Sequence, residues 1–206
     1  NALAKEAAKR PSNRMRALEL VEWMKSRGLQ PNAASYGAVV NTFAKAGDID
    51  GAKEQLRRIE TVGMLDVIAC NTVMQALVDH ARMREAESWL EEIRSKEIQP
   101  NVRTYNPLMN GHAKLGRARE AGLVLQQMQQ HGVHPDIVAH SAFVRAQAKA
   151  NNFSGAFDWV KAMPGMRVQP NVVTYTSIVS ELARTRRGSG VEMATKLLSH
   201  MALNRV

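Results

Sequence analysis

Apolar residues recur along the chain with the spacing of amphipathic helices. Val39 and Val40 follow Tyr36 by three and four residues, so the three side chains lie on one face of a helix. A second apolar group with helical spacing follows after a short turn that contains Gly47 and Asp48. No segment alternates apolar and polar residues as a half-buried β-strand does. The pattern predicts pairs of helices that are joined by tight turns.

The pair of helices is a repeating unit. Equivalent places in successive pairs are 34, 35, 35 and 35 residues apart and hold Tyr36, Cys70, Tyr105, His140 and Tyr175. We place full repeats at 33–66, 67–101, 102–136 and 137–171, and partial repeats at 1–32 and 172–206, the last with an insertion at Arg187–Gly190. One helical hairpin cannot bury its apolar face alone, so neighbouring repeats have to stack. We therefore predict a single all-α domain over residues 1–206, a right-handed α-solenoid of stacked helix-turn-helix repeats.

Polar residues occupy positions five, nine and thirteen of each repeat, all in its first helix, with Gly37 as the exception. These positions share one face because successive members are four residues apart, as in Asn106, Asn110 and Lys114. The cations on this face, which we expect to contact phosphates, are Lys45, Lys114, Arg145, Lys149 and Arg184. Stacked repeats would align amides and cations in a groove, and such a groove suits single-stranded nucleic acid. A solvated helix face with capping residues at its start is the alternative interpretation.

The charge balance narrows the class of partner. Lys and Arg number 28 against 19 Asp and Glu, and the net charge of +9 favours an acidic polymer or surface as partner. Cys70 is the single cysteine, which excludes a disulfide scaffold and a cysteine-rich zinc site. His131 and His134 have no third ligand nearby in sequence, so we expect no metal and no cofactor. No apolar stretch is long enough to cross a membrane, and we expect neither membrane insertion nor enzyme activity.

Several segments resemble the pentatricopeptide repeat family. They are PNVRTYN at Pro100–Asn106, PNVVTYT at Pro170–Thr176, KLGR at Lys114–Arg117 and the pair Glu120–Ala121. The resemblance covers essentially the whole chain. The first full repeat departs from the family's pattern because it is one residue short and has Leu65–Asp66 where Pro-Asp or Pro-Asn is expected.

The resemblance implies non-catalytic binding of single-stranded RNA, with one base for each repeat. In this family the fifth and last residues of a repeat select the base, and the second residue packs against it. Carried onto this sequence, the base-selecting residues are Gly37, Asp66, Asn71, Asn101, Asn106, Asp136, Ser141, Asn171 and Thr176. The base-packing residues are Ala34, Ile68, Arg103, Val138 and Val173.

The family's pairing rule gives each pair of residues a base. Asn71 with Asn101 implies a pyrimidine, leaning to cytosine. Asn106 with Asp136 implies uracil, and Ser141 with Asn171 implies adenine. The implied core is pyrimidine–uracil–adenine, read 5′ to 3′ from the N-terminus to the C-terminus.

The family's usual setting implies a mitochondrion or a plastid, and a role in organellar RNA metabolism or translation. Protein subunits of a larger ribonucleoprotein complex are a further class of partner. The alternative function is that of a scaffold subunit in a ribosome or transcription complex, which binds protein through the repeat ends or the convex face. Trp23, Trp89 and Trp159 fall on second helices, where we expect them to pack in the core.

Overall fold

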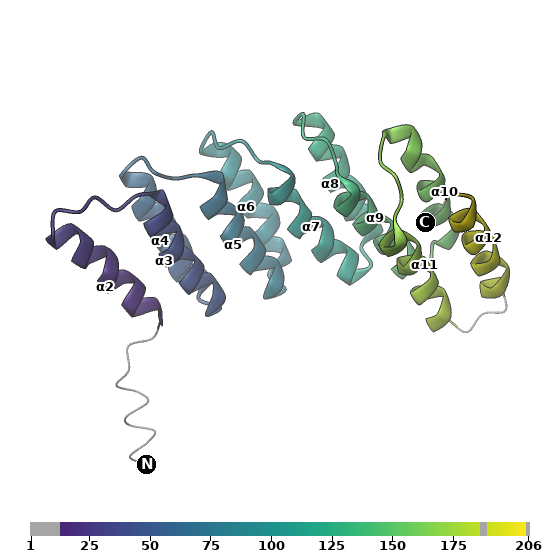
Figure 1. Ribbon diagram of the computed structural model, residues 1–206, viewed down its shortest axis with the longest axis horizontal. Coiled ribbons are helices and arrows are strands. Elements are labelled where there is room, and N and C mark those ends of the chain that lie inside the picture. Colours follow the sequence, from purple (N-terminus) through teal and green to yellow (C-terminus); the bar gives the residue numbers. More distant parts are fainter. Residues whose placement is uncertain (1–12, 186–188, 205–206) are drawn as a thin grey trace, which may run out of the picture. The chain divides into compact units, whose positions relative to one another are not determined.

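The computed structural model describes residues 13–185 and 189–204, which are helical except for short connections (Figure 1). The α-helices are α2 (Asn13–Ser26), α3 (Ala33–Lys45), α4 (Ile49–Thr61), α5 (Val67–Asp79), α6 (Met83–Ser95), α7 (Val102–Leu115), α8 (Ala118–Gln130), α9 (Ile137–Lys149), α10 (Phe153–Ala162), α11 (Val172–Arg184) and α12 (Ser189–Leu203). A 3-10 helix, η1 (Met163–Met166), follows α10 directly. The described residues contain no β-strand, as the sequence predicts. The predicted insertion at Arg187–Gly190 and the first partial repeat fall partly outside the described residues.

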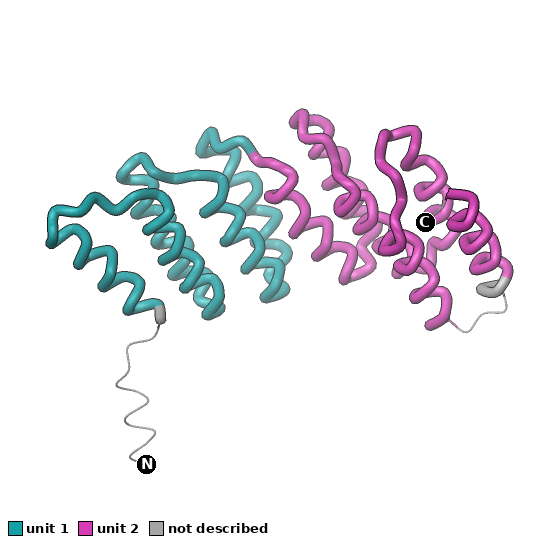
Figure 2. Tube along the Cα trace, in the orientation of Figure 1, with its two compact units in different colours: residues 1–99 teal, residues 100–206 magenta. Residues whose placement is uncertain are grey.

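The helices form two compact units, residues 1–99 and 100–206, which Figure 2 separates by colour. In the first unit, α3 packs on α2, α4 and α5, and α5 packs on α6. In the second unit, α7 packs on α8 and α9, and α9 packs on α10 and α11. The first helices of successive hairpins therefore lie side by side within the second unit, in the order α7, α9, α11 (Figure 1). This arrangement brings equivalent positions of neighbouring repeats together.

Each first helix of a full hairpin begins at a polar residue whose side chain accepts a backbone N–H of the first turn. These caps are Asn32, Asp66, Asn101, Asp136 and Asn171. At Asn101 and Asn171 the cap is a capping box, in which the hydroxyls of Thr104 and Thr174 bind the cap residue in return. All of the caps except Asn32 are also residues that we predicted to end a repeat and to select a base. One side chain thus both starts a helix and stands at the edge of the polar face.

The predicted apolar stripes form the core. Val39 and Val40 of α3 are buried, and Tyr105 of α7 and Tyr175 of α11 are buried completely. The alanine column of the second helices is also fully buried, at Ala52, Ala86, Ala121 and Ala156. A methyl group leaves room for a neighbouring helix, so these alanines mark the places where helix axes approach closely.

The tryptophans behave differently from one another. Trp89 is buried, and its Nε1–H donates to the Cys70 carbonyl at 3.1 Å. Trp159 packs edge-on against Phe143, with ring centroids 4.5 Å apart. For Trp23 the predicted core position is wrong, because its side chain is 50% exposed. Val21 faces inward on α2, and a residue two places further is turned about 200° around the helix, away from the core.

Candidate nucleic-acid interface

In the second unit, Asn106 of α7 and Asp136 at the start of α9 form a hydrogen-bonded pair. Asn106 Nδ2 donates to the Asp136 carboxylate at 3.2 and 3.4 Å. Asp136 also accepts the Ala139 N–H at 2.9 Å, which holds the carboxylate in place. Asn106 Oδ1 is buried and has no hydrogen-bond partner among the described residues. The carboxylate can only accept, so the amide atom of Asn106 that faces it must be the nitrogen. The amide oxygen is then an acceptor to which no N–H or O–H in the described part of the chain donates.

The next predicted pair, Ser141 of α9 and Asn171 at the start of α11, is arranged differently. Ser141 is buried, and its hydroxyl lies 2.7 Å from the hydroxyl of Thr174, not on Asn171. Thr174 Oγ1 in turn donates to Asn171 Oδ1 at 3.0 Å. The two predicted residues are therefore linked through a third, which sequence reasoning missed. The signal was present, because Thr174 stands at the position of a capping-box partner three residues after Asn171.

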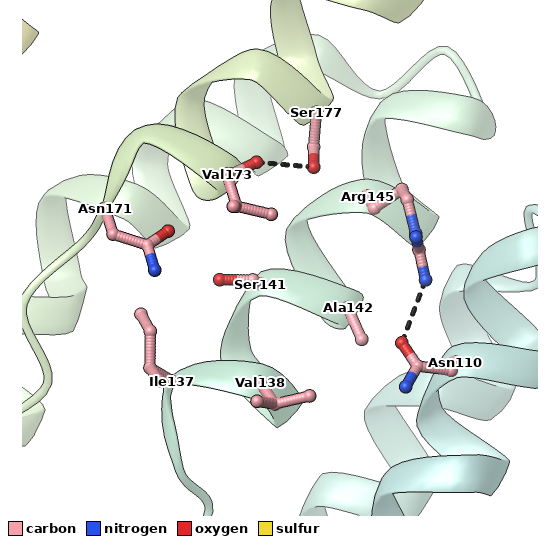
Figure 3. A pocket seen from close by; sticks show the side chains of 9 residues that line it. All are labelled: Asn110, Ile137, Val138, Ser141, Ala142, Arg145, Asn171, Val173 and Ser177. Atoms are coloured by element: carbon pink, nitrogen blue, oxygen red, sulfur yellow. Dashed lines mark hydrogen bonds between the residues drawn. The ribbon is translucent and has the colours of Figure 1, made fainter.

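A cavity of about 180 Å³ opens between α9 and α11, and it brings together most of the residues predicted for one base (Figure 3). Its lining residues are Asn110, Ile137, Val138, Ser141, Ala142, Arg145, Asn171, Val173 and Ser177. The predicted base-packing residues Val138 and Val173 are 43% and 62% exposed. In Figure 3 the side chains of Ser141 and Asn171 face one another across the cavity. A flat ring between two exposed valines would meet these polar groups at its edge.

The predicted phosphate-binding cations of the second unit are not equivalent. Arg145 Nη2 donates to Asn110 Oδ1 at 2.9 Å, and Arg145 Nε is buried with no partner among the described residues (Figure 3). The Lys149 ammonium donates to the carbonyl of Lys114 at the end of α7. Lys114 and Arg184 have exposed side chains, and Arg184 pairs loosely with Glu181 at 3.5 Å. Arg145 and Lys149 thus join neighbouring helices, whereas Lys114 reaches solvent.

The first unit offers fewer groups for recognition. Gly37 has no side chain, and a Cβ there would meet no atom within 4 Å. Asp66 caps α5 by accepting the Ala69 N–H at 2.8 Å. Ala34, Ile68 and Lys45 are exposed, and Asn71 is half-buried. The pair of Gly37 and Asp66 therefore presents a single functional side chain.

The remaining predicted residues lie at the beginnings of α7 and α11. Arg103 has an exposed side chain, and its backbone N–H donates to Asn101 Oδ1 at 2.9 Å. Thr176 is exposed, and its hydroxyl donates to the Val172 carbonyl at 2.8 Å. Asn71 and Asn101, predicted to act as a pair, belong to different units.

The titratable side chains of His140 and Cys70 are buried in the core. Burial lowers the pKa of His140 from its ordinary value of 6.5, against an opposing effect of Asp136, and Trp159 Nε1–H donates to its Nδ1 at 3.2 Å. Burial raises the pKa of the Cys70 thiol to about 12, so the sulfur is protonated at neutral pH and is not a nucleophile.

The described residues contain no cluster of three His, Cys, Asp or Glu side chains that could hold a metal ion. Among the described helices none has the length and hydropathy of a membrane span.

Three sequence models of known repeat families match the chain. A model described as PPR repeat family matches residues 65–114 and 102–149. A model described as pentatricopeptide repeat domain matches residues 5–46, and one described as PPR repeat matches residues 34–64. The resemblance that rests on the sequence motifs is confirmed by these matches.

Curated relatives come from Arabidopsis thaliana. One pentatricopeptide repeat-containing protein is 34% identical over 93 residues, which are 43% of this chain and 18% of that protein. A chloroplastic one is 27% identical over 103 residues, 49% of this chain and 21% of that protein. A mitochondrial one is 27% identical over 88 residues, 42% of this chain and 11% of that protein. This chain therefore spans about a fifth of the length of these relatives or less.

Solved structures show the same fold. The pentatricopeptide repeat protein PPR10 from maize matches 92% of this chain and 27% of its own, with a TM-score of 0.69 and 25% identity. PPR10 in complex with an 18-nt psaJ RNA element matches 90% of this chain and 28% of its own, with a TM-score of 0.68 and 26% identity. The PPR domain of Arabidopsis thaliana protein-only RNase P 1, in complex with tRNA, matches in fold alone, with a TM-score of 0.61 and 13% identity over 79% of this chain and 84% of that domain. The predicted fold class, an all-α solenoid of helical hairpins, is confirmed.

Proposed function

The chain belongs to the pentatricopeptide repeat family, and on that premise we propose that it binds single-stranded RNA selectively and without catalysis. The observation that supports this most is the cavity between α9 and α11. It combines two exposed valines with the polar groups of Ser141 and Asn171. A base that stacks on apolar side chains and places its edge on a few polar atoms needs a site of this composition. The RNA complex of maize PPR10, a structure of the same fold, supports the same choice of ligand.

In our proposal Asn106 and Asp136 read a uracil. Asp136 holds the Asn106 amide by its nitrogen, so Asn106 Oδ1 is the group that remains for a base. Uracil has an N3–H donor on its Watson–Crick edge, whereas cytosine has an acceptor at that place. Satisfying a buried acceptor is worth about 1 to 3 kcal/mol, which is enough to prefer one pyrimidine over the other.

Among Lys114, Arg145 and Lys149, the exposed Lys114 is best placed for a phosphate, since Arg145 and Lys149 bind protein groups. A phosphate contact carries no base information and weakens with salt. Lys45 and Arg184, both exposed, take the same role at their repeats in this proposal.

The test is a fluorescence anisotropy titration of the full chain with short single-stranded RNAs that contain cytosine–uracil–adenine, against permuted sequences, at low and high salt. We expect preferential and salt-sensitive binding to the first set. Lys114→Ala should weaken binding to all sequences and flatten the salt dependence, while Asn106→Ala should relax the choice at one base. Lys161→Ala is the matched control, because Lys161 lies on the second helix α10 in an ion pair with Asp158 at 2.7 Å.

Equal losses on every sequence for Asn106→Ala would contradict the role given to that residue. Absence of RNA binding by the unmodified chain would contradict the proposed function and favour the scaffold alternative. A mitochondrial or plastid location is part of the proposal and is supported by the chloroplastic and mitochondrial relatives. Localisation of the tagged full-length protein outside both organelles would overturn that part.

A further inference from the structure

Two residues that line the cavity, Ser141 and Asn171, are joined by the buried Thr174 in a chain of hydrogen bonds in which each hydroxyl proton has an assigned direction. Asn171 Oδ1 accepts the Thr174 backbone N–H at 3.0 Å, which identifies this atom of the amide as the oxygen. Thr174 Oγ1 lies 3.0 Å from the same oxygen, so the threonine hydroxyl has to donate to it. The one hydroxyl proton of Thr174 is then used. Thr174 Oγ1 therefore accepts from its other neighbours, the Asn171 N–H at 3.3 Å and Ser141 Oγ at 2.7 Å.

The consequence falls on Ser141. Because Thr174 has no second proton to give, the Ser141 hydroxyl must donate to Thr174 and presents only lone pairs to the cavity. Asn171 Nδ2 has no partner among the described residues and presents N–H groups. Thr174 is completely buried, so no water competes for its hydroxyl. The cavity wall thus offers an acceptor beside a donor, in a fixed order.

We propose that Thr174 is a positioning residue for base selection, which makes Ser141 an acceptor and thereby selects a base with an exocyclic amino group. This inference rests on the proposed function. Adenine places an amino donor beside the N1 acceptor, which complements Ser141 Oγ and Asn171 Nδ2. Hypoxanthine has the same size but the reverse order, an O6 acceptor beside an N1–H donor. The selectivity therefore comes from the proton direction set by a residue that itself does not line the cavity.

The test compares RNAs that carry adenine or hypoxanthine at the base next to Ser141 and are otherwise identical, bound to the full chain. We expect the unmodified chain to prefer adenine. Thr174→Val frees the Ser141 proton to turn toward an acceptor on the base, so the ratio of the two affinities should fall by roughly fivefold, the factor that one ordinary hydrogen bond gives. Thr174→Ser keeps the hydroxyl and should keep the ratio.

Thr104→Val is the matched control. Thr104 is completely buried in the equivalent capping box of α7, where the Asn101 N–H donates to its hydroxyl at 3.0 Å, and it does not contact Ser141. Both valine variants lose the same kind of cap, so thermal denaturation should show similar losses of stability. We expect the adenine preference to fall only in Thr174→Val, which separates a positioning role from a structural one.

An unchanged ratio in folded Thr174→Val, or a chain that binds RNA with no preference for adenine over hypoxanthine, would overturn the inference and leave the proposed function standing. A chain that binds no RNA would overturn both. If Thr174→Val does not fold, Ser141→Ala decides, because it removes the acceptor directly. A ratio in Ser141→Ala equal to that of the unmodified chain would also overturn the inference.

Discussion

Helices α7 and α9 carry equivalent positions of neighbouring repeats, yet the polar side chain at the fifth position of each repeat is held by a different hydrogen-bond partner. In α7, Asn106 bonds to a carboxylate, Asp136, that can only accept. In α9, Ser141 bonds to a hydroxyl, Thr174, whose own proton is already committed to Asn171. In both cases the group that we propose to face a base is hydrogen-bonded to a residue at the start of the following helix. For Asn106 this residue is the last one of its own repeat, but for Ser141 it is Thr174 of the next repeat, which a repeat-by-repeat interpretation of the sequence leaves out.

The two helices also differ in the core and at their ends. Tyr105 of α7 is replaced by His140 in α9, a residue whose pKa responds to burial. After α7 the chain turns through Gly116 at φ 67°, and at the equivalent place after α9 it turns through Asn151 at φ 61°. The same backbone is thus built with different residues, and each difference can be tested separately.

The largest expected effect is a loss of RNA affinity at the site on α9 that leaves the site on α7 unchanged. Val173→Asp places a charge on the wall of the cavity beside Ser141 and should reduce affinity for an adenine-containing RNA at least about tenfold, since stacking on one base is worth about 1 to 3 kcal/mol. The uracil preference at Asn106 should remain. Val172→Asp is the control, because Val172 is 53% exposed and does not line the cavity. Equal losses in both variants, measured by anisotropy titration, would show that charge alone is responsible.

The turns after the two helices give the next effect. Gly116→Ala should lower the free energy of unfolding by about 1 kcal/mol, because a side chain at positive φ is strained and the new Cβ would lie 3.2 Å from Lys149 Cγ. Asn151→Gly should raise it by about 0.5 kcal/mol or less, since asparagine tolerates this backbone region. Urea denaturation measures both. Gly165→Ala, where a Cβ meets no atom within 4 Å, should be close to neutral, and a loss there as large as at Gly116 would refute the explanation.

A smaller change tests the carboxylate of the α7 site. Asp136→Asn keeps a capping side chain on α9, so stability should change little. The new amide can accept or donate, which lets the Asn106 amide turn over and removes its preference for a donor on the base. The ratio of affinities for uracil and cytosine should then fall by about fivefold, the value of one hydrogen bond. A ratio that stays at its original value in a competition titration would contradict the role of Asp136.

The smallest effect concerns the pH dependence of stability. The pKa of His140 in the folded chain lies below its ordinary value of 6.5, so between the two values the unfolded chain binds a proton that the folded chain does not. Stability should therefore fall as the pH drops below 6.5. His140→Gln keeps an acceptor for Trp159 Nε1–H and does not titrate, so its stability should depend less on pH. Identical pH profiles of the two proteins in thermal denaturation would exclude this contribution.

The repeat period and the apolar columns were sufficient to predict the fold. Residues such as Ala52 and Tyr105 recur at fixed separations, and packing of a helical hairpin demands that periodicity. The exposure of Trp23 could not be predicted in this way. Whether a second helix buries a tryptophan depends on which of two neighbouring residues faces the core, and on α2 that residue is Val21.

The candidate site could be predicted in part. The sequence resemblance paired Ser141 with Asn171 and grouped Val138 and Val173 with them, and in the structure all four line one cavity. It did not reveal that Thr174 joins Ser141 to Asn171, because a hydrogen bond between residues 33 positions apart depends on how α9 and α11 pack. The sequence likewise did not reveal that Arg145 and Lys149, which we predicted to contact phosphates, donate to groups on α7. Long cationic side chains reach the neighbouring helix as easily as solvent, and periodicity does not distinguish the two.

The most direct measurement is a competition titration of the full chain with single-stranded RNAs that differ only in the two adjacent bases proposed to face Asn106 and Ser141. Every combination of the two bases is compared at one salt concentration. If neighbouring helices in the second unit each read one base, uracil followed by adenine binds most tightly and each substitution weakens binding independently of the other. Equal affinity for all combinations would contradict selective recognition by these residues.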